Sequence, residues 1–367
     1  MYLKGILILV SLSISIPAFS FEQDRGHKND ASKVYFVSPL GSDKNNGSTQ
    51  EDAFKTIQHA LNLAHAGESI ILLKGEYFED LKTVRSGTLA SPIKIKGLAG
   101  SVLKGRKRSR IFEINHSYIE LSNFSINGKI SDGRTVDDYR DKLVYIQGLK
   151  NIGVTGVKLL GMDLQYAKGE CVRIKYLASK NEIAYTNIQH CGVRDFVFNR
   201  GKHNGESIYI GTAPEQVAEG KNPTNVMDTS HSNWIHNNVI ESYGSECVDV
   251  KEGSHSNIIE NNLCTQQKDP NVGGVSIRGN ANTVRNNIIF TNQGAGIRLG
   301  GDTSEDGIKN IVYGNYLSNN AQGALKIMSN AQQNSFCGNL IFVEGTQKKT
   351  RSRYKQKVPL ILCKEPK

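Results

Sequence analysis

The feature that most constrains the fold of this chain is a short phrase that returns about every 25 residues. Its copies read NEIAYTNI, NWIHNNVI, NIIENNLC, NTVRNNII, NIVYGNYL and NSFCGNLI, and each carries a second asparagine before an apolar residue. These second asparagines are Asn187, Asn238, Asn262, Asn287, Asn315 and Asn339, at successive intervals of 51, 24, 25, 28 and 24 residues. A recurring period indicates stacked structural units, one of which carries a large insertion.

A second recurring phrase lies between these copies and has the alternation of a β-strand. It appears as GECVRIK, GESIYIG, SECVDVK, GGVSIRG, GAGIRLG and GALKIMS. Valine, isoleucine and leucine fall on one face of each strand, because side chains alternate between the two faces. The opposite face carries Arg173, Lys175, Tyr209, Asp249, Lys251, Ser276, Arg278, Arg298 and Lys326.

Short strands that repeat in register without intervening amphipathic helices predict an all-β, right-handed, single-stranded parallel β-helix. Each repeat forms one coil, and the recurrent asparagines stack into a hydrogen-bonded ladder. A β-sandwich also contains closely spaced strands, but it gives no reason for the same phrase to return in register. We expect the β-helix to cover residues 21–345 and a solvated basic tail to cover residues 346–367.

The first part of this domain, about residues 21–75, has the pattern of a cap. YFVSPLGSDKNNGS predicts a strand and a turn. Phe54, Ile57, Leu61 and Ala64 then lie at helical spacing. Because the open end of a solenoid must be covered, we predict a capping helix at this position.

Residues 1–20 have the pattern of a secretory signal peptide. Lys4 precedes an apolar run from Ile6 to Ile16, and a small-x-small cleavage pattern, Ala18-Phe19-Ser20, follows. The run is shorter than the ~20 apolar residues that a spanning helix needs. No later segment is apolar enough to span a membrane. We therefore expect a soluble protein that is exported to the periplasm or the medium.

Export makes disulfides possible for the six cysteines of the chain. These are Cys171, Cys191, Cys247, Cys264, Cys337 and Cys363. Their order leaves the connectivity open, although a bond between Cys337 and Cys363 would tie the basic tail to the domain. No two of them have the Cys-x-x-Cys spacing typical of zinc and redox sites.

The strong positive charge of the chain narrows the class of its partner. The formal net charge is +10, which suits a polyuronate, a sulfated glycan or an anionic surface. Nucleic acid is disfavoured, because aromatic residues are few and no basic motif studded with them stands out. We expect a monomer that binds an acidic polysaccharide of the alginate, pectate or glycosaminoglycan class.

The stretch SECVDVKEGS concentrates charge on one strand. Glu246, Asp249, Lys251 and Glu252 lie among valine and cysteine. One interpretation is a solvated ladder in which unlike charges pair across coils. The other is a site where the acids hold a cation and the lysine moves a proton.

The chain resembles the exported pectate-lyase-like superfamily of β-helices. The stretch YFVSPLGSD…AFKTIQHALNLAHAGESIILLKGEYFE is similar to the opening of many such proteins, and the likeness extends to about residue 345. The nearest resemblance is to the alginate lyase and chondroitinase B family, in which a strand with acids and a lysine precedes, by one coil, a strand with an arginine. Here these strands are ECVDVK and VSIRGN.

The same strand also resembles the calcium-binding strand of pectate lyases, D-G-L-x-D-x-K-x-G-S. It matches the second acid at Asp249 but has Ser245 in place of the first. The resemblance therefore implies a Ca²⁺ cofactor and leaves the ligand set open. We expect Asn204, Glu246 and Asp249 as ligands, with Glu206 and Glu252 as alternates.

The resemblance implies a polysaccharide lyase that cleaves a uronic-acid-containing polymer by calcium-assisted β-elimination. Such an enzyme must neutralise the uronate carboxylate, remove the C5 proton and expel the 4-oxygen substituent. We assign Lys251 as the base and Arg278 as the acid or carboxylate clamp. The residues expected to contact substrate are Arg298, Tyr209, Arg173, Lys175 and Lys326.

The strand spacing supports this assignment. Asp249 and Lys251 are two residues apart and point to the same face. In the next coil Arg278 takes the position of Lys251, about 4.8 Å away, and Arg298 is aligned with Asp249 one coil beyond. We expect the charge of Arg278 to lower the pKa of Lys251 towards that of a usable base.

Two other functions fit the same pattern. A uronate C5-epimerase shares the proton abstraction and returns a proton to the opposite face, which Tyr209 would supply. A glycan-binding or surface β-helix would use the charges without chemistry.

Overall fold

The computed structural model describes residues 32–201, 204–328, 333–342 and 350–352. The expected signal peptide, most of the basic tail and Cys363 lie outside these residues, so the signal, the tail and the Cys337–Cys363 pairing stay predictions. The domain boundaries also stay predictions. Within the described residues, no helix combines the length and the apolar character needed to cross a membrane.

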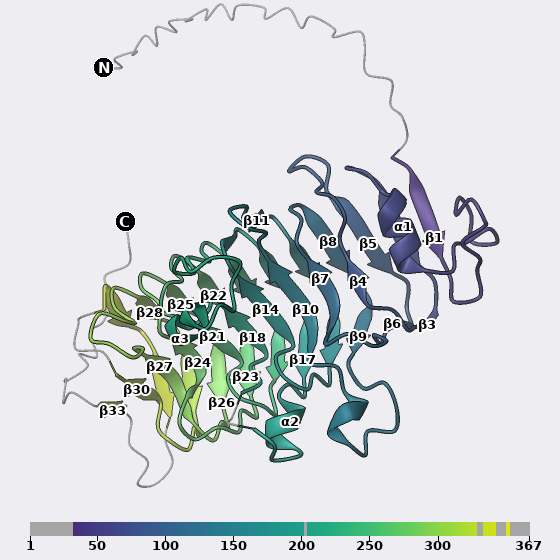
Figure 1. The fold of residues 1–367 in the computed structure, drawn as a ribbon. Coiled ribbons are helices and arrows are strands. Elements are labelled where there is room, and N and C mark those ends of the chain that lie inside the picture. The colour runs from purple at the N-terminus through teal and green to yellow at the C-terminus, as the bar shows by residue number, and fades with distance from the viewer. Residues whose placement is uncertain (1–31, 202–203, 329–332, 343–349, 353–367) are drawn as a thin grey trace, which may run out of the picture. The chain divides into compact units, whose positions relative to one another are not determined.

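The predicted right-handed parallel β-helix is confirmed. Short strands pair in parallel with the equivalent strands of neighbouring coils, and three long sheets run along the solenoid from the α1 end to the β33 end (Figure 1). A two-stranded sheet of β11 (Val154–Thr155) and β15 (Ala178–Ser179) fills a corner. We call the long sheets 1, 2 and 3.

The strands of each sheet follow in the order of their pairing. Sheet 1 contains β1 (Val34–Val37), β2 (Ser69–Leu72), β5 (Ile93–Gly97), β8 (Ile119–Ser122), β12 (Lys158–Leu160), β16 (Glu182–Ala184), β19 (Trp234–His236), β22 (Ile258–Glu260), β25 (Thr283–Arg285), β28 (Ile311–Tyr313) and β31 (Ser335–Cys337). Sheet 2 contains β3 (Gly75–Tyr77), β6 (Ser101–Leu103), β9 (Ser125–Asn127), β13 (Asp163–Gln165), β17 (Asn187–Gln189), β20 (Val239–Glu241), β23 (Leu263–Thr265), β26 (Ile288–Phe290), β29 (Tyr316–Ser318) and β32 (Leu340–Phe342). Sheet 3 contains β4 (Leu81–Lys82), β7 (Arg110–Ile114), β10 (Lys142–Gln147), β14 (Val172–Lys175), β18 (Ile208–Ile210), β21 (Val248–Val250), β24 (Gly273–Ile277), β27 (Ala295–Leu299), β30 (Leu325–Ile327) and β33 (Thr350–Ser352).

The recurrent asparagines form buried ladders at two corners of the coils. In one of them, Asn238 Nδ2 donates to Asn262 Oδ1 at 2.9 Å and Asn262 Nδ2 donates to Asn287 Oδ1 at 3.0 Å. The first rung of this ladder is Thr186 rather than Asn187, because the Thr186 N–H donates to Asn238 Oδ1 at 3.0 Å. Each rung satisfies backbone and side-chain groups that would otherwise be buried without partners.

The predicted capping helix is also confirmed. Helix α1 (Ile57–Leu63) begins at Thr56, whose hydroxyl accepts the N–H of His59 at 3.3 Å. Ile57 and Leu61 are buried in the apolar core, as their helical spacing predicted. The helix packs against β1, β2 and β4 and covers the first coil (Figure 1).

The long interval between Asn187 and Asn238 contains two excursions on either side of β18. The first includes α2 (Val193–Phe196), and the second includes α3 (Pro214–Ala218). A short 3-10 helix, η1 (Val136–Asp138), precedes β10. We call residues 212–229 the α3 segment, because its contacts with sheet 3 bear on the site described below.

Two disulfides lie inside the solenoid beside sheet 3. Cys171 pairs with Cys191, and Cys247 pairs with Cys264, with Cα–Cα distances of 5.5 and 5.9 Å. All four cysteines are buried. Cys247 directly follows Glu246, so this bond anchors the strand that carries the SECVDVK charges.

Candidate active site on sheet 3

The register of sheet 3 aligns its outward side chains in three rows across the coils. The row at the start of the strands contains Arg110, Lys142, Glu170, Glu206 and Glu246. The middle row contains Lys82, Glu113, Tyr145, Arg173, Tyr209, Asp249, Ser276, Arg298 and Lys326. The row at the end contains Gln147, Lys175, Lys251 and Arg278. Arg278 follows Lys251 by one coil and Arg298 is aligned with Asp249, as the strand pattern predicted.

We call these three rows on the outer face of sheet 3 the strip. Three acids of adjacent coils meet in it. Glu206, Glu246 and Asp249 each place a carboxylate oxygen within 4.8 Å of the other two. Their exposed fractions are only 5%, 1% and 0%. Glu246 Oε2 accepts the Ser245 hydroxyl at 2.6 Å, whereas Glu246 Oε1 is buried and has no hydrogen-bond partner among the described residues. We call these three residues the acidic triad.

Burial and mutual repulsion make the negative charges of Glu206 and Glu246 unfavourable. Burial, followed by the charge of Glu246, raises the pKa of Glu206 to about 8. Burial and the charge of Asp249 also raise the pKa of Glu246. Clustered carboxylates of this kind either keep a proton or share a cation. Their oxygen donors and the unpartnered Glu246 Oε1 fit a hard divalent cation such as Ca²⁺.

Lys251 lies directly against the triad. Its Nζ is 2.7 Å from Asp249 Oδ2 and 4.6 Å from the centroid of the Tyr209 ring. Burial opposes the charged amine, but the Asp249 carboxylate outweighs burial and raises the pKa of Lys251. The expected lowering of this pKa is therefore wrong. Arg278 does act in the predicted direction, but the carboxylate on the same strand has the greater effect.

Two arginines complete the basic side of the strip. Arg278 Nε lies 3.5 Å from Asp249 Oδ1, and its Nη1 lies 3.8 Å from Glu252 Oε1. Burial raises the pKa of Glu252. Burial and the charge of Arg278 lower the pKa of Arg298, whose Nε has no hydrogen-bond partner among the described residues. An anion placed between the two arginines would relieve this repulsion.

Arg173 and Lys175 lie two coils before Lys251, beneath the α3 segment. The Arg173 guanidinium stacks 3.4 Å from the centroid of Tyr209, while its Nη1 contacts Glu170 Oε1 at 2.7 Å. Lys175 Nζ donates to the Lys221 carbonyl at 2.8 Å. Burial, and then the charge of Arg173, lowers the pKa of Lys175 to about 7. Both side chains, which were expected to contact substrate, therefore already have partners within the protein.

The other two expected site residues, Asn204 and Lys326, make contacts of a different kind. Asn204 is exposed, and its backbone N–H donates to Asp195 Oδ2 at 2.7 Å. Lys326 Nζ donates to the Asn271 carbonyl. Of the expected cation ligands, Glu206, Glu246 and Asp249 are therefore buried together. Asn204 is exposed.

Sequence reasoning missed the ion-pair cluster around Glu170. Lys142 Nζ lies 2.7 Å from Glu170 Oε2, and Arg173 contacts the other oxygen. Burial opposes the ionised form of Glu170, but Lys142 and Arg173 outweigh it and lower its pKa to about 2. The signal was present, because GECVRIK, GESIYIG and SECVDVK each place a glutamate at the same position before the strand.

The chain shares its parallel β-helix fold, as its sequence indicated, with several solved structures, among them an alginate lyase and a pectate lyase. An alginate lyase from Paenibacillus sp. str. FPU-7 is 19% identical, with 80% of this chain and 95% of that chain covered and a TM-score of 0.56. Pectate lyase Pel9A is 14% identical, with 87% and 78% covered and a TM-score of 0.54. The GH136 lacto-N-biosidase from Eubacterium ramulus (native protein) is 12% identical, with 88% and 65% covered and a TM-score of 0.55. At these identities the likeness shows a shared fold.

Within that fold, the chain belongs to the DUF1565 family, described as proteins of unknown function, whose family model matches residues 40–268. It is also similar to the uncharacterized protein YwoF of Bacillus subtilis (strain 168), at 24% identity over 189 residues. That match covers 52% of this chain and 35% of YwoF, so the chain spans about a third of the length of this relative.

Proposed function

We propose that the chain is an exported polysaccharide lyase that cleaves a uronic-acid-containing polysaccharide by β-elimination, with the strip on sheet 3 as its active site. The observation that carries this proposal is the acidic triad, which adjoins Lys251, Arg278 and Arg298 on one face. The shared fold with alginate and pectate lyases supports it. The two buried disulfides are consistent with export.

Glu206, Glu246 and Asp249 would hold the cation. A bound Ca²⁺ would supply positive charge that stabilises a uronate carboxylate and weakens the hold of Asp249 on Lys251. Arg278 stays charged because, although burial opposes the charge, the Asp249 and Glu246 carboxylates raise its pKa. It therefore serves as a carboxylate clamp together with Arg298.

The proton transfers fall to Lys251 and Tyr209. Lys251, as the neutral amine, takes the C5 proton, the electron pair forms the C4–C5 double bond, and the bond from C4 to the leaving oxygen breaks. Burial raises the pKa of Tyr209 to about 12, so its hydroxyl keeps a proton at neutral pH. Tyr209 is then the group that protonates the leaving oxygen.

Glycoside hydrolysis is a second candidate, and the unequal titration of the triad favours it. The pKa of Glu206 is raised to about 8, whereas Lys251 and Arg278 outweigh the effect of burial and lower the pKa of Asp249. Carboxyl groups whose pKa values are driven apart are suited to separate acid and base roles. Retaining glycosidases hold such a pair about 5 Å apart. The complete burial of Asp249 counts against its direct attack on a sugar.

A substrate screen separates these reactions. The purified protein is incubated with alginate, pectate, chondroitin and dermatan sulfates, heparin-type glycans and hyaluronan, with Ca²⁺ and with a chelator. A lyase raises the ultraviolet absorbance of unsaturated uronate ends on one polymer, and the chelator suppresses the rise. New reducing ends without that absorbance would establish hydrolysis instead and contradict the lyase proposal.

A further inference from the structure

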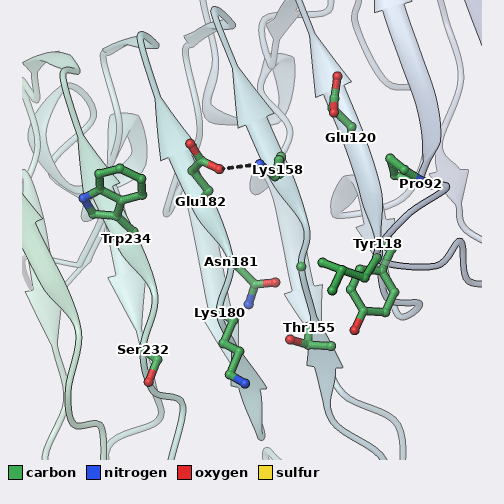
Figure 2. A pocket seen from close by; sticks show the side chains of 12 residues that line it. Pro92, Tyr118, Glu120, Thr155, Lys158, Lys180, Asn181, Glu182, Ser232 and Trp234 are labelled. Atoms are coloured by element: carbon green, nitrogen blue, oxygen red, sulfur yellow. Dashed lines mark ion pairs between the residues drawn. The ribbon is translucent and has the colours of Figure 1, made fainter. Parts of the chain in front are cut away.

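A groove on the outer side of sheet 1 lies apart from the sheet 3 strip. It crosses β8, β12, β16 and β19 and has a volume of about 370 Å³. Its lining includes Pro92, Tyr118, Lys158, Glu182 and Trp234, which Figure 2 shows along successive strands. None of the residues assigned to the proposed active site lines this groove.

Trp234 forms one end of the groove and is held in a fixed orientation. Its ring stacks on His236 with 3.6 Å between centroids, and its Nε1 donates to Glu260 Oε1 at 2.6 Å. The side chain nevertheless stays 40% exposed. A rigid, exposed indole loses little conformational freedom on binding and offers an apolar face to a ligand ring.

Tyr118 lies towards the other end, three strand spacings from the Trp234 strand. Since adjacent strands are about 4.8 Å apart, this separation is about 14 Å along the solenoid. The Tyr118 ring lies against Gly156, where a Cβ atom would come within 2.6 Å of the ring. Gly156 also has a positive φ of 68°. Glycine is therefore favoured at this position both by the backbone conformation and by the close approach of the Tyr118 ring. The groove thus has two aromatic residues separated by the length of a short oligosaccharide.

Charged side chains between the aromatic residues cancel one another. Lys158 Nζ pairs with Glu182 Oε2 at 2.8 Å, and the lining adds Lys180 and Glu120 (Figure 2). Two bases and two acids leave no formal net charge. The groove therefore offers a polyuronate no net electrostatic attraction, whereas an uncharged sugar finds donors and acceptors for its hydroxyls.

We propose that this groove is a second saccharide-binding site, which takes an uncharged oligosaccharide with one ring stacked on Trp234. The inference is independent of the proposed lyase reaction, because it uses none of the sheet 3 residues. It gives the two faces of the solenoid different ligands, an anionic glycan on sheet 3 and a neutral glycan on sheet 1.

Intrinsic fluorescence tests this directly, because Trp234 is the single tryptophan of the chain. Cellotetraose, xylotetraose and chitotetraose are titrated into the full-length protein beside tetragalacturonate and tetramannuronate. We expect a saturable fluorescence change with at least one uncharged tetrasaccharide and a weaker one, or none, with the uronates. No saturable change with any neutral probe, or a change with the uronates alone, would overturn the proposal.

Variants then locate the binding. Tyr118→Ala is expected to weaken the fluorescence-detected affinity about tenfold. Trp234→Ala, followed by calorimetry, is expected to weaken binding at least as much. Lys251→Ala is expected to leave it unchanged, which separates this site from the proposed active site. Circular dichroism confirms that each variant is folded. Neutral-sugar binding that survives both aromatic substitutions, or is lost in folded Lys251→Ala, would place the site elsewhere and contradict the inference.

Discussion

Sheets 1 and 3 both carry lysine, arginine and acidic side chains in register, yet the two faces differ in how these charges are satisfied. On sheet 1, Lys158 is exposed and pairs with Glu182 of the next strand. On sheet 3, Asp249 and Glu246 are buried, and Glu246 Oε1 has no hydrogen-bond partner within the described part of the chain. Cross-strand charge pairing therefore produces solvated ion pairs on sheet 1 and buried, unsatisfied acidic groups on sheet 3.

The excursions beside β18 contribute to this difference. The α3 segment contacts Arg173 through Gln216 Oε1 at 2.9 Å and Lys175 through the Lys221 carbonyl. Covered charges lose water, so each must find a protein partner, a proton or a ligand. The comparison indicates that burial, more than the charge pattern itself, distinguishes the unsatisfied charges of sheet 3 from the solvated ion pairs of sheet 1.

The largest expected effect is on turnover. Lys251→Ala removes the proposed base and should lower kcat on the substrate polymer by about 100-fold to 10,000-fold. The matched sheet 1 variant, Lys158→Ala, removes an exposed, paired lysine and should keep wild-type kcat. Initial rates of absorbance increase measure both variants. Full activity in Lys251→Ala would show that another residue takes the C5 proton.

The two faces should also differ in the cost of losing an acid. Asp249→Ala removes the carboxylate that both Lys251 and Arg278 contact and leaves these two charges buried. The free energy of unfolding should therefore fall by about 3–5 kcal/mol. Glu182→Ala on sheet 1 should cost less than about 1 kcal/mol. Chemical denaturation of both variants gives the comparison. Equal losses would mean that Asp249 contributes no more to the free energy of unfolding than Glu182 does.

The disulfides should stabilise the coils beneath sheet 3. Cys247 and Cys264 are separated by 17 residues in sequence, and closing a loop of this length stabilises the fold by about 3 kcal/mol. The double variant Cys247→Ser/Cys264→Ser should therefore lower the thermal midpoint and weaken cation binding by the triad. The neutral-sugar site on sheet 1 should be affected less. A greater loss of sugar binding than of cation binding would contradict this local role.

A pH dependence of stability is expected from Lys175, whose pKa is lowered to about 7 by burial and then by Arg173. An amine with a lowered pKa binds fewer protons in the folded than in the unfolded chain above pH 7. Stability should therefore rise with pH from about 7 towards the ordinary lysine pKa near 10.4. Lys175→Met should reduce this slope relative to the wild type, as measured by denaturation at several pH values. An unchanged slope would mean that Lys175 titrates normally.

The repeat and the alternation were enough to predict the fold and the rows of the candidate site. The sequence repeat alone predicted that Arg278 is aligned with Lys251 and Arg298 with Asp249, because parallel coils stack equivalent residues. Even the error at the ladder was small, since Thr186 replaces Asn187 as a rung by a shift of one position.

Features that depend on loop packing or on individual side-chain contacts could not be predicted in this way. The contacts of the α3 segment with Arg173 and Lys175 depend on loop packing that no repeat encodes. The raised pKa of Lys251 depends on a 2.7 Å contact with Asp249 that competes with the effects of burial and Arg278. The disulfide pairing depends on which cysteines meet inside the solenoid, and their order in sequence does not reveal this.

Calorimetric titration of Ca²⁺ into the metal-free protein tests the central claim most directly. Glu246→Gln removes one charge from the triad with little change in shape, and Glu182→Gln makes the same change on sheet 1. We predict one Ca²⁺ site in the wild type and in Glu182→Gln, and its loss or strong weakening in Glu246→Gln. No binding to the wild type, or equal binding to all three proteins, would show that the acidic triad is not a calcium site.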